Sequence, residues 1–299
     1  MNFESFSSIL TGKQILRNEP MSRHTTFGIG GPADWFLLPY TKEELQSVFH
    51  RVQQEGVPCF ILGGGANLLV RDKGIRGVVI STKRLRKLYR TGETITAEAG
   101  VPTAQAAQFA GREGLSGMEF AGGIPGTVGG AAFMNAGAYG GDMGKLIVSI
   151  ETCGSGGMFH TYGREELGYA YRHSLFMERP EVIVSVTLSL TPGIREDIEA
   201  EMAALNARRR EKQPLEFRSA GSTFKRPEGH FTGAMIEALG LKGFSVGDAA
   251  VSDKHAGFLI NKGKATCADM LALMAEVERR VRDGYGVELE PEVQIVGEK

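Results

Sequence analysis

Glycine-rich segments hold the residues of this chain whose types and spacing best suit ligand binding. The longest reads FAGGIPGTVGGAAFMNAGAYGG at 120–141, with 8 glycines among 22 residues, interleaved with apolar side chains. Flexible linkers are polar and rich in Gly and Ser, so this segment is predicted to pack, with its backbone passing close to something. Backbone N–H groups turned to one side form concave anion sites, which suit a phosphate or pyrophosphate. A tightly turned, glycine-rich core corner is the alternative that this segment alone leaves open.

Two shorter glycine clusters point in the same direction. LGGGANLLV at 62–70 directly follows an apolar run at 57–62, which predicts a buried strand that ends in a glycine turn. FGIGGPAD at 27–34 is the third cluster. None is a Walker loop or a dinucleotide fingerprint, and GSTFK at 221–225 has its lysine on the wrong side for a P-loop. Together the three turns predict a large phosphate-bearing ligand wrapped by backbone.

Four short polar groups stand out from apolar surroundings and offer side-chain chemistry. YAYRHS at 169–174 sets an arginine among aromatic residues, and RSAGSTFK at 218–225 sets hydroxyls before a lysine. EPE at 290–292 lies in the terminal apolar pattern, and RRR at 208–210 ends a polar helix. Each has a structural alternative: an arginine stacked on tyrosine, a tight turn entering a strand, a solvated strand face, and a solvated helix end.

Composition excludes several classes of function. The chain has 299 residues, enough for two or three domains, and a formal net charge of −1, which argues against a nucleic-acid partner. Cys59, Cys153 and Cys267 are odd in number and far apart, so we expect buried thiols in a reducing compartment. His173 and His255 have no partners at metal-ligand spacing, and no G-x-S-x-G elbow occurs. Without an 18-residue apolar run or a signal-like N-terminus, we expect a cytoplasmic protein with no membrane partner.

The elements that must position these groups form an α+β pattern. A capping box of Thr41 and Glu44 starts a helix that ends at Gly56, and Thr266 caps another over 268–282. Further helices are predicted at 102–109, 195–211 and 234–239, and the sparse apolar stripe of 195–211 predicts a bridge between domains. Strands are predicted at 57–62, 75–80, 146–152, 182–190, 222–225, 257–260 and 287–296. The predicted domains are 1–83, 84–195 and 200–299.

Taken together, these segments resemble the UDP-N-acetylenolpyruvoylglucosamine reductases, or UDP-N-acetylmuramate dehydrogenases, of peptidoglycan synthesis. The ordered motifs span nearly the whole chain, which makes the resemblance specific. They are RHTTFGIGGPADW at 23–35, ILGGGANLLV at 61–70, the complete 120–141 segment, YAYRHSLF at 169–176, SAGSTFKRP at 219–227, SDKHAGFLINKG at 252–263 and LEPEVQIVGE at 289–298. The short chain, the GSTFK form and the absence of a tyrosine-bearing insertion resemble the second structural type of the family.

The resemblance implies the two-subdomain FAD-binding fold of the vanillyl-alcohol oxidase type, plus a C-terminal α+β substrate-binding domain. The FAD-binding subdomains would be 1–83 and 84–195, and the substrate domain 200–299. FAD is expected to be non-covalent. The implied cofactor-binding residues are Gly63, Gly64, Gly65, Ala66, Asn67, Leu68, Gly122, Gly123, Ile124, Pro125, Gly126, Thr127, Gly129 and Gly130 around the pyrophosphate, with Asn135, Gly137, Ala138 and Tyr139 bordering the flavin.

The resemblance also implies a reaction. NADPH reduces the flavin, and the enolpyruvyl ether of UDP-N-acetylglucosamine then takes hydride from flavin N5 at C3 and a proton at C2. Arg172 and Glu292 match residues that stabilise the carboxylate charge developing in the transition state, and Ser222 matches the proton donor. Residues matching positions near the substrate are Tyr171, Lys212 and Lys225. We expect a monomer whose partners are this substrate and NADPH.

Two positions depart from the family pattern, and two other functions compete. Arg218 stands where proline is common and Gln294 where arginine is frequent, which weakens any transfer of diphosphate contacts. An FAD-dependent oxidase of the same fold, acting on an alcohol or amine, is one alternative, because fold does not fix chemistry. The set Arg172, Ser222 and Glu292 argues against it. The other alternative is a nucleotide-sugar-binding protein that has lost catalysis, with Gln294 as its only support.

Overall fold

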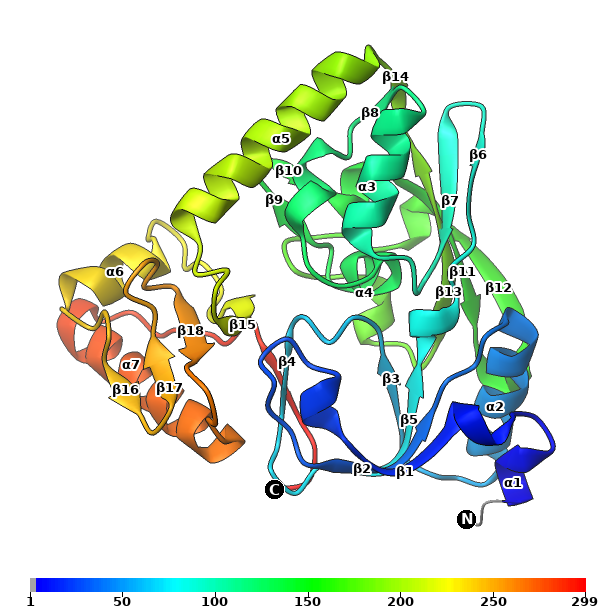
Figure 1. Cartoon of the computed structure of the whole chain (residues 1–299), viewed down its shortest axis with the longest axis horizontal. Coiled ribbons are helices and arrows are strands. Elements are labelled where there is room, and N and C mark those ends of the chain that lie inside the picture. Colours follow the sequence, from blue (N-terminus) through cyan, green and yellow to red (C-terminus); the bar gives the residue numbers. More distant parts are fainter. Residues whose placement is uncertain (1–3) are drawn as a thin grey trace. The chain divides into compact units, whose positions relative to one another are not determined.

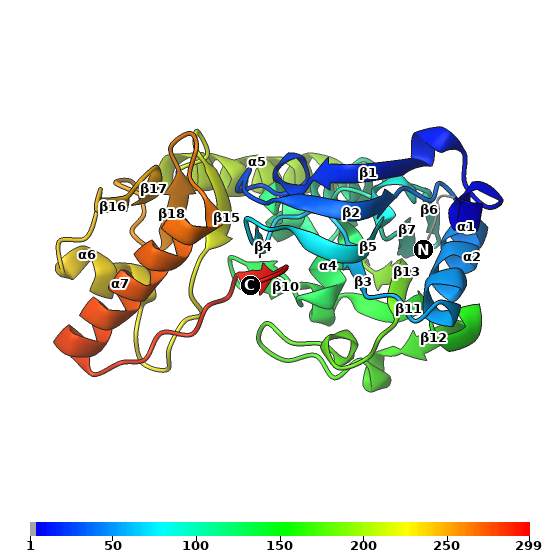
Figure 2. The same cartoon turned by 90° about the horizontal axis from the view of Figure 1, so that it is seen from below.

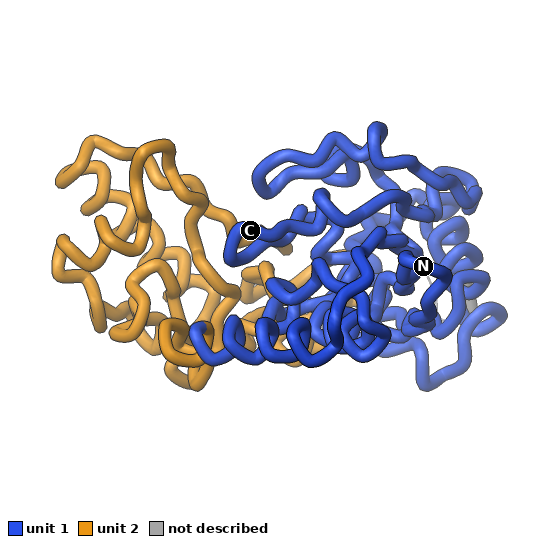
Figure 3. Tube along the Cα trace, turned by 90° about the horizontal axis from the view of Figure 1, so that it is seen from above, with its two compact units in different colours: residues 1–17, 35–64, 77–208 blue, residues 18–34, 65–76, 209–299 orange. Residues whose placement is uncertain are grey.

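The computed structural model describes residues 4–299, and contacts among them divide the chain into two compact units (Figure 3). Unit 1 comprises the segment ending at Arg17, Trp35–Gly64 and Gly77–Arg208. Unit 2 comprises Asn18–Asp34, Gly65–Arg76 and Arg209–Lys299. The chain passes into the last part of unit 2 inside helix α5 (Arg195–Lys212), the helix whose sparse apolar stripe predicted a bridge. The boundaries of the three predicted domains stay a prediction.

A four-stranded sheet follows the order β1-β2-β5-β3 (Figure 1). Its strands are β1 (Ile15–Pro20), β2 (Pro32–Leu37), β5 (Ile75–Ser81) and β3 (Cys59–Leu62). β3 and β5 run parallel, with Leu62 opposite Ser81. Both strands were predicted from their apolar runs, and β3 ends where the glycine turn at 63 begins.

Helix α2 (Lys42–Gln54) packs its apolar face into one hydrophobic cluster of unit 1. Leu45, Val48, Phe49 and Val52, which recur at helical spacing, are buried. The Thr41 hydroxyl accepts a hydrogen bond from the Glu44 N–H at 3.2 Å and caps the helix. The Glu44 carboxylate accepts from the backbone N–H of Tyr40 at 2.6 Å, one residue before the predicted capping-box partner. Phe6 of the short helix α1 (Glu4–Ser7) belongs to the same cluster.

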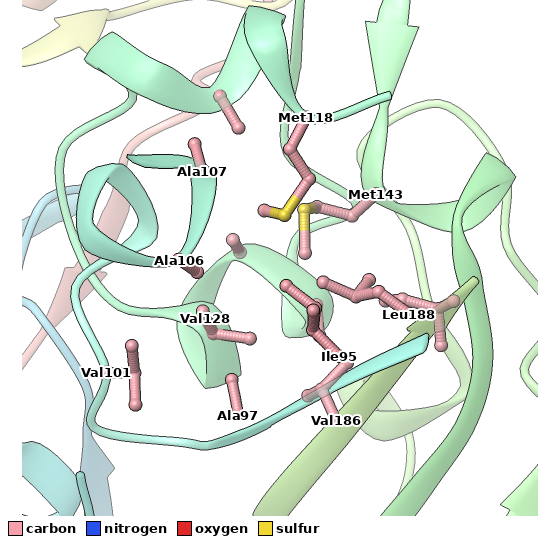
Figure 4. Close-up of a cluster of buried hydrophobic side chains, with 14 of the residues drawn as sticks. Ile95, Ala97, Val101, Ala106, Ala107, Met118, Val128, Met143, Val186 and Leu188 are labelled. Atoms are coloured by element: carbon pink, nitrogen blue, oxygen red, sulfur yellow. The ribbon is translucent and has the colours of Figure 1, made fainter. Parts of the chain in front are cut away.

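The second sheet of unit 1 has the order β12-β11-β13-β7-β6, and its paired strands are antiparallel. Its strands are β6 (Leu88–Thr91), β7 (Thr94–Glu98), β11 (Ile147–Cys153), β12 (Phe159–Gly163) and β13 (Val182–Ser189). Helices α3 (Thr103–Arg112) and α4 (Val128–Phe133) bury small apolar residues in the same cluster as β7 and β13. Figure 4 shows Ala106, Ala107 and Val128 of these helices near Ile95, Ala97, Val186 and Leu188. Small side chains let the helix backbones approach the sheet closely.

Short elements complete unit 1. Two-stranded pairs join β8 (Leu115–Ser116) to β14 (Thr191–Pro192) and β9 (Gly137–Ala138) to β10 (Gly141–Asp142). Short 3-10 helices along the chain are η1 (Gly12–Gln14), η2 (Met21–Arg23), η3 (Thr82–Arg84), η4 (Glu119–Gly123), η5 (Met143–Lys145), η6 (Ser155–Gly157), η7 (Arg164–Glu166) and η8 (Leu175–Met177). The glycine-rich segment 120–141 thus contains most of η4, helix α4 and the hairpin that begins with β9. Its apolar residues pack in the core, as its composition predicted.

Unit 2 centres on a four-stranded antiparallel sheet of order β15-β18-β17-β16. Its strands are β15 (Arg218–Ser222), β16 (Ser245–Val246), β17 (Ala249–Val251) and β18 (Phe258–Asn261). Helices α6 (Thr232–Ala238) and α7 (Cys267–Tyr285) lie against it (Figures 1 and 2). Thr266 and Asp269 form a reciprocal capping box at the start of α7, and Met270, Leu273, Met274, Val277 and Val281 are buried. Leu271 is only partly buried against the same cluster.

Two strand predictions in unit 2 were wrong. The strand expected at 222–225 is β15, which ends at Ser222. The terminal strand expected over 287–296 is only β19 (Gln294–Val296), which pairs in parallel with β4 (Leu68–Val70). Residues before Gln294 form a single isolated bridge, Phe224 opposite Pro291, because proline offers no N–H to continue a ladder.

The cysteines differ from one another in exposure. Cys153 and Cys267 are buried, and burial raises the pKa of each thiol to about 11. Cys59, which was also expected to be buried, is exposed. Within residues 4–299, no helix is both long enough and apolar enough to span a bilayer.

Candidate active site

Two of the predicted FAD-binding turns meet in unit 1. The turn after β3 brings Gly64 against the loop before α4, where a Cβ on Gly64 would lie 2.3 Å from the Gly126 Cα. A Cβ on Gly63 would lie 2.9 Å from the Thr127 hydroxyl oxygen. Backbone atoms already fill the Cβ position at Gly64, so glycine there is a packing requirement, whereas the close neighbour of Gly63 is a side-chain hydroxyl. We call Gly63, Gly64, Gly126 and Thr127 the glycine cradle.

The glycine cradle leaves hydrogen-bonding groups available for a ligand. The backbone N–H groups of Gly64 and Gly126 donate to no other residue in the described part of the chain. The Thr127 side chain is 5% exposed, and its hydroxyl has no hydrogen-bond partner among residues 4–299. Buried polar groups in native proteins are nearly always paired, so unpaired donors here fit an anionic ligand such as the FAD pyrophosphate.

Two hydroxyls that the sequence analysis did not single out share this property. Ser81 is the last residue of β5 and pairs with Leu62, which directly precedes Gly63 of the cradle. The Thr103 backbone N–H donates to the Gly126 carbonyl at 3.1 Å. Both side chains are fully buried, and neither hydroxyl has a partner within the described residues. In the sequence, the only signal for either residue was a hydroxyl side chain directly after a short run of mostly apolar residues.

The third glycine cluster has a packing explanation. Within unit 2, a Cβ on Gly31 would lie 2.0 Å from the Asp72 carbonyl oxygen, and one on Gly30 would lie 2.8 Å from the Val70 side chain. The Gly28 Cβ position is occupied by the Arg218 side chain, at 2.5 Å from its Nη1. Glycine in this cluster therefore makes room for neighbouring backbone and side chains of the protein itself.

The segment predicted to border the flavin continues from α4 in unit 1. Gly137 and Ala138 form β9, and Tyr139 follows with a positive φ of 52°. The Tyr139 ring is 39% exposed, with the Arg208 guanidinium 5.3 Å from its centroid. Asn135 is buried, also at positive φ, and both ends of its amide are hydrogen-bonded inside unit 1.

Arg172 lies at the tip of a tight turn in unit 1. Ala170 and His173 exchange both backbone hydrogen bonds at 3.2 Å, which leaves Tyr171 and Arg172 as the two turn residues. Arg172 has a φ of 54°, a conformation that favours glycine or asparagine at this turn position. Its guanidinium lies 5.2 Å from the centroid of the 60%-exposed Tyr171 ring. A strained backbone at a charged residue is a feature that often marks functional sites.

A partly buried tyrosine, Tyr169, directly precedes this turn. The Tyr169 ring fills the Cβ position of Gly144, at 2.9 Å. Its hydroxyl has no hydrogen-bond partner within the described chain, and burial raises the pKa of that phenol. The Tyr169 phenol therefore stays protonated.

Ser222 ends β15 in unit 2 immediately after a bulge. Ser219 pairs with Ile260 and Ser222 with Phe258, so one extra residue lies on the β15 side. Gly221 has a φ of 78°. Ser222 is exposed, whereas the next residue, Thr223, is fully buried. Bulges of this kind redirect a side chain, and here the bulge presents the serine hydroxyl at the surface of unit 2.

Glu292 lies beside the residue that follows Ser222. The Glu292 N–H donates to the Thr223 carbonyl at 2.8 Å, and the Glu292 carbonyl accepts from Asn67 Nδ2 at 2.9 Å. The structure thus brings two of the predicted catalytic segments together within unit 2. Glu292 is half-buried, while Glu288 and Glu290 are exposed, so the solvated strand face considered for this segment does not extend to Glu292.

The predicted catalytic and substrate-binding residues divide between the two units (Figure 3). Arg172 and Tyr171 belong to unit 1, and Ser222, Glu292, Lys212 and Lys225 to unit 2. The Lys225 ammonium forms an ion pair with Glu290, and the Lys225 N–H donates to the Glu290 carbonyl at 2.8 Å. Lys212 is exposed at the end of α5.

Known proteins are similar to this chain over nearly its whole length. A family model described as an FAD binding domain matches residues 33–162. A second, described as the C-terminal domain of UDP-N-acetylenolpyruvoylglucosamine reductase, matches residues 213–296. The reductase of that name from Syntrophomonas wolfei is 48% identical over 298 residues, covering 99% of this chain and 100% of the relative. The chain belongs to the UDP-N-acetylenolpyruvoylglucosamine reductase family.

Other family members support the assignment. The reductase from Caldanaerobacter subterraneus is 46% identical over 296 residues, covering 99% of this chain and 98% of its own. The crystal structure of the Thermus caldophilus enzyme is 36% identical, with a TM-score of 0.79, and the match covers 94% of this chain and 97% of that one. The family, the α+β fold with its FAD-binding domain and the class of FAD-dependent oxidoreductase, all predicted from the sequence, are confirmed.

Proposed function

We propose that this family member reduces the enolpyruvyl ether of UDP-N-acetylglucosamine to the lactyl ether, UDP-N-acetylmuramate, with NADPH as the reductant. The observation that carries the proposal is the full-length similarity to reductases of that name, joined to the Ser222–Glu292 region of unit 2. The reaction would take place in the cytoplasm and supply a peptidoglycan precursor. We also propose that the enzyme works as a monomer.

We propose that FAD is held non-covalently by the glycine cradle and the loops that continue from it. Bound FAD would supply the redox step, taking hydride from NADPH and giving it from N5 to C3 of the enolpyruvyl group. The unpaired amides of Gly64 and Gly126 and the Thr127 hydroxyl support a pyrophosphate at this place. Ser81 and Thr103 would donate further hydrogen bonds to the cofactor, because their buried hydroxyls lack protein partners within residues 4–299.

Arg172 would bind the substrate carboxylate. An enol ether is a poor hydride acceptor, so negative charge that develops toward the carboxylate must be stabilised in the transition state. The planar guanidinium donates two parallel hydrogen bonds to a carboxylate. The tight turn fixes its backbone, which limits the entropy lost on binding. Tyr171, whose ring contacts the guanidinium, would help to orient it.

Ser222 would give the proton to C2, and Glu292 would assist at the carboxylate. A hydroxyl is a weak acid, so it serves only a strongly basic carbon and must be held in position. The bulge at Gly221 and the buried Thr223 on either side of Ser222 supply that positioning. A protonated Glu292 would donate to the carboxylate as its charge grows. Lys212 and Lys225 would contact the nucleotide-sugar part of the substrate.

Anaerobic spectroscopy tests the proposed reaction. Purified protein should be yellow, NADPH should bleach it, and the enolpyruvyl substrate should restore the colour while forming a product heavier by two hydrogen atoms. Flavin that NADPH does not reduce, or that only an alcohol or amine reduces, would identify an oxidase of the same fold. Substrate binding without reoxidation would identify a binding protein that has lost catalysis.

Acid precipitation tests the binding mode of the cofactor. All flavin should appear in the supernatant as FAD. Flavin retained on the protein pellet, or FMN in place of FAD, would contradict non-covalent FAD binding.

A further inference from the structure

The amide of Asn135 joins two segments of unit 1. Its Nδ2 donates to the Ala170 carbonyl at 2.8 Å, and its Oδ1 accepts from the Gly144 N–H at 2.8 Å. The side chain is buried, with the residue 7% exposed. The two partners fix the orientation of the amide, because a carbonyl requires a donor and an N–H requires an acceptor. Asn135 also adopts a φ of 45°, which asparagine tolerates better than most residues.

Ala170 is the first residue of the tight turn that carries Arg172. The turn closes through its two backbone bonds with His173, and its tip holds Arg172 in the left-handed region. On the far side of the turn, the fully buried Ser174 donates its hydroxyl to the Phe133 carbonyl at 2.6 Å. The Arg172 turn is therefore attached on both flanks to the same short segment, 133–135.

Segment 133–135 is itself continuous with the glycine cradle. Helix α4 begins at Val128, directly after Thr127 of the cradle, and ends at Phe133. The Val128 and Gly129 N–H groups donate to the carbonyls of Val101 and Ala99 at 2.8 and 3.0 Å, which attaches the start of α4 to the loop after β7. A short, rigid path thus leads from the cradle to the Arg172 turn inside one unit.

We propose that Asn135 and Ser174 are positioning residues that set the Arg172 turn relative to the glycine cradle. This inference rests on the proposed role of Arg172 at the substrate carboxylate. The two side chains hold the strained turn in place, so that the guanidinium is oriented before substrate arrives. Removing either attachment lets the turn relax, and even a shift of about 1 Å in a substrate-positioning group can reduce a rate about 100-fold.

Half-reaction kinetics on the holoenzyme separate this role from a direct contact with the flavin. The variants are Asn135→Gly, which removes the amide while relieving the positive φ, and Ser174→Ala. Each should slow reoxidation of the reduced enzyme by substrate roughly 10- to 100-fold and raise the substrate KM, while flavin reduction by NADPH and FAD affinity change less than about twofold. The control is Asn18→Gly, since Asn18 is exposed and has a φ of 50°, and it should leave both half-reactions unchanged.

A double-mutant cycle with Arg172→Ala decides whether the effect passes through Arg172. Residues that act through one another are non-additive, so Asn135→Gly and Ser174→Ala should cause little further loss when Arg172 is already alanine. Equal losses in both backgrounds, or an altered FAD affinity or flavin spectrum, would overturn the positioning role in favour of a direct flavin contact. If Arg172→Ala alone leaves reoxidation intact, the proposed role of Arg172 fails, and this inference fails with it. Melting temperatures of the FAD-free proteins show whether any variant has lost its fold.

Discussion

The cradle glycine Gly64 and the bulge glycine Gly221 serve two regions of this enzyme for opposite reasons. At Gly64 the position of a Cβ is already filled, because the Gly126 Cα lies 2.3 Å from it. At Gly221 nothing lies within 4 Å of that position, but φ is 78°. Glycine is needed in the cradle because it has no Cβ, and in the bulge because it adopts a positive φ readily.

The difference separates cofactor binding from chemistry. In the proposed FAD site the backbone of the cradle would itself be the binding surface, so a side chain there would occupy space that the cofactor or the neighbouring backbone needs. In the bulge the backbone redirects Ser222, so under the proposed mechanism the side chain next to the glycine would carry the function. Substitutions in the two regions should therefore fail in different assays, and the following tests run from the largest expected effect to the smallest.

Ser222→Ala should give the largest effect and leave the cradle untouched. Reoxidation of the reduced enzyme by substrate should slow by about 10²–10⁴-fold, because positioned acid catalysis is worth that much. Flavin reduction by NADPH should stay near the wild-type rate. Separate anaerobic stopped-flow measurements of the two half-reactions test this, and a loss confined to the NADPH step would remove Ser222 from the proton-donor role.

Glu292→Gln should also act on the side-chain region alone. The amide keeps the shape and a donor, but it cannot share a proton with the substrate carboxylate as charge develops there. Loss of one such stabilising group is worth roughly 10²–10³-fold in rate. Reoxidation rates at verified equal FAD content test the prediction, with Glu290→Gln as the exposed neighbouring control. A ratio near one would leave the carboxylate to Arg172.

Gly64→Ala should damage the cradle without altering the chemistry of enzyme that retains FAD. The new methyl group overlaps backbone, and such overpacking typically costs about 1–3 kcal/mol, which corresponds to roughly 5- to 150-fold weaker FAD binding if it falls on the bound state. Flavin fluorescence during dissociation measures the affinity. The control is Gly12→Ala, where no atom lies within 4 Å of the Cβ position. Unchanged FAD affinity would show that the cradle adapts by moving.

Gly221→Ala should give the smallest effect. It should change both the stability of the fold and the rate of reoxidation. Placing alanine at this φ costs roughly 1–2 kcal/mol of folding stability, measurable by urea unfolding. The matched control is Gly229→Ala, at a φ of 71° and with open space around it. Both variants should lose similar stability, but only Gly221→Ala should slow reoxidation. Equal reoxidation rates in the two variants would mean that the bulge does not direct Ser222.

Local signals in the sequence predicted much of the fold. Helix starts at Thr41 and Thr266 followed from capping side chains that bond backbone N–H groups within the first turn. Strands β3 and β5 followed from apolar runs, and the glycine turn followed from the strand that precedes it. The family and the FAD-dependent chemistry also followed from ordered motifs, because each motif is contiguous in the chain.

Features that depend on contacts between distant residues were decided only by the tertiary structure. The sequence by itself places glycine at 28, 30, 31, 63 and 64, but only the packed structure shows that the first three positions lie against other parts of the protein and that cradle donors stay unpaired among the described residues. The apolar alternation at 287–296 predicted one long strand, yet strand length depends on available partners, and only residues 294–296 find a ladder, on β4. The resemblance placed Asn135 at the border of the flavin, but only the structure shows that its amide bonds to Ala170, 35 residues away. A hydrogen bond requires two groups within about 3 Å in space, and spacing along the chain carries no record of that distance.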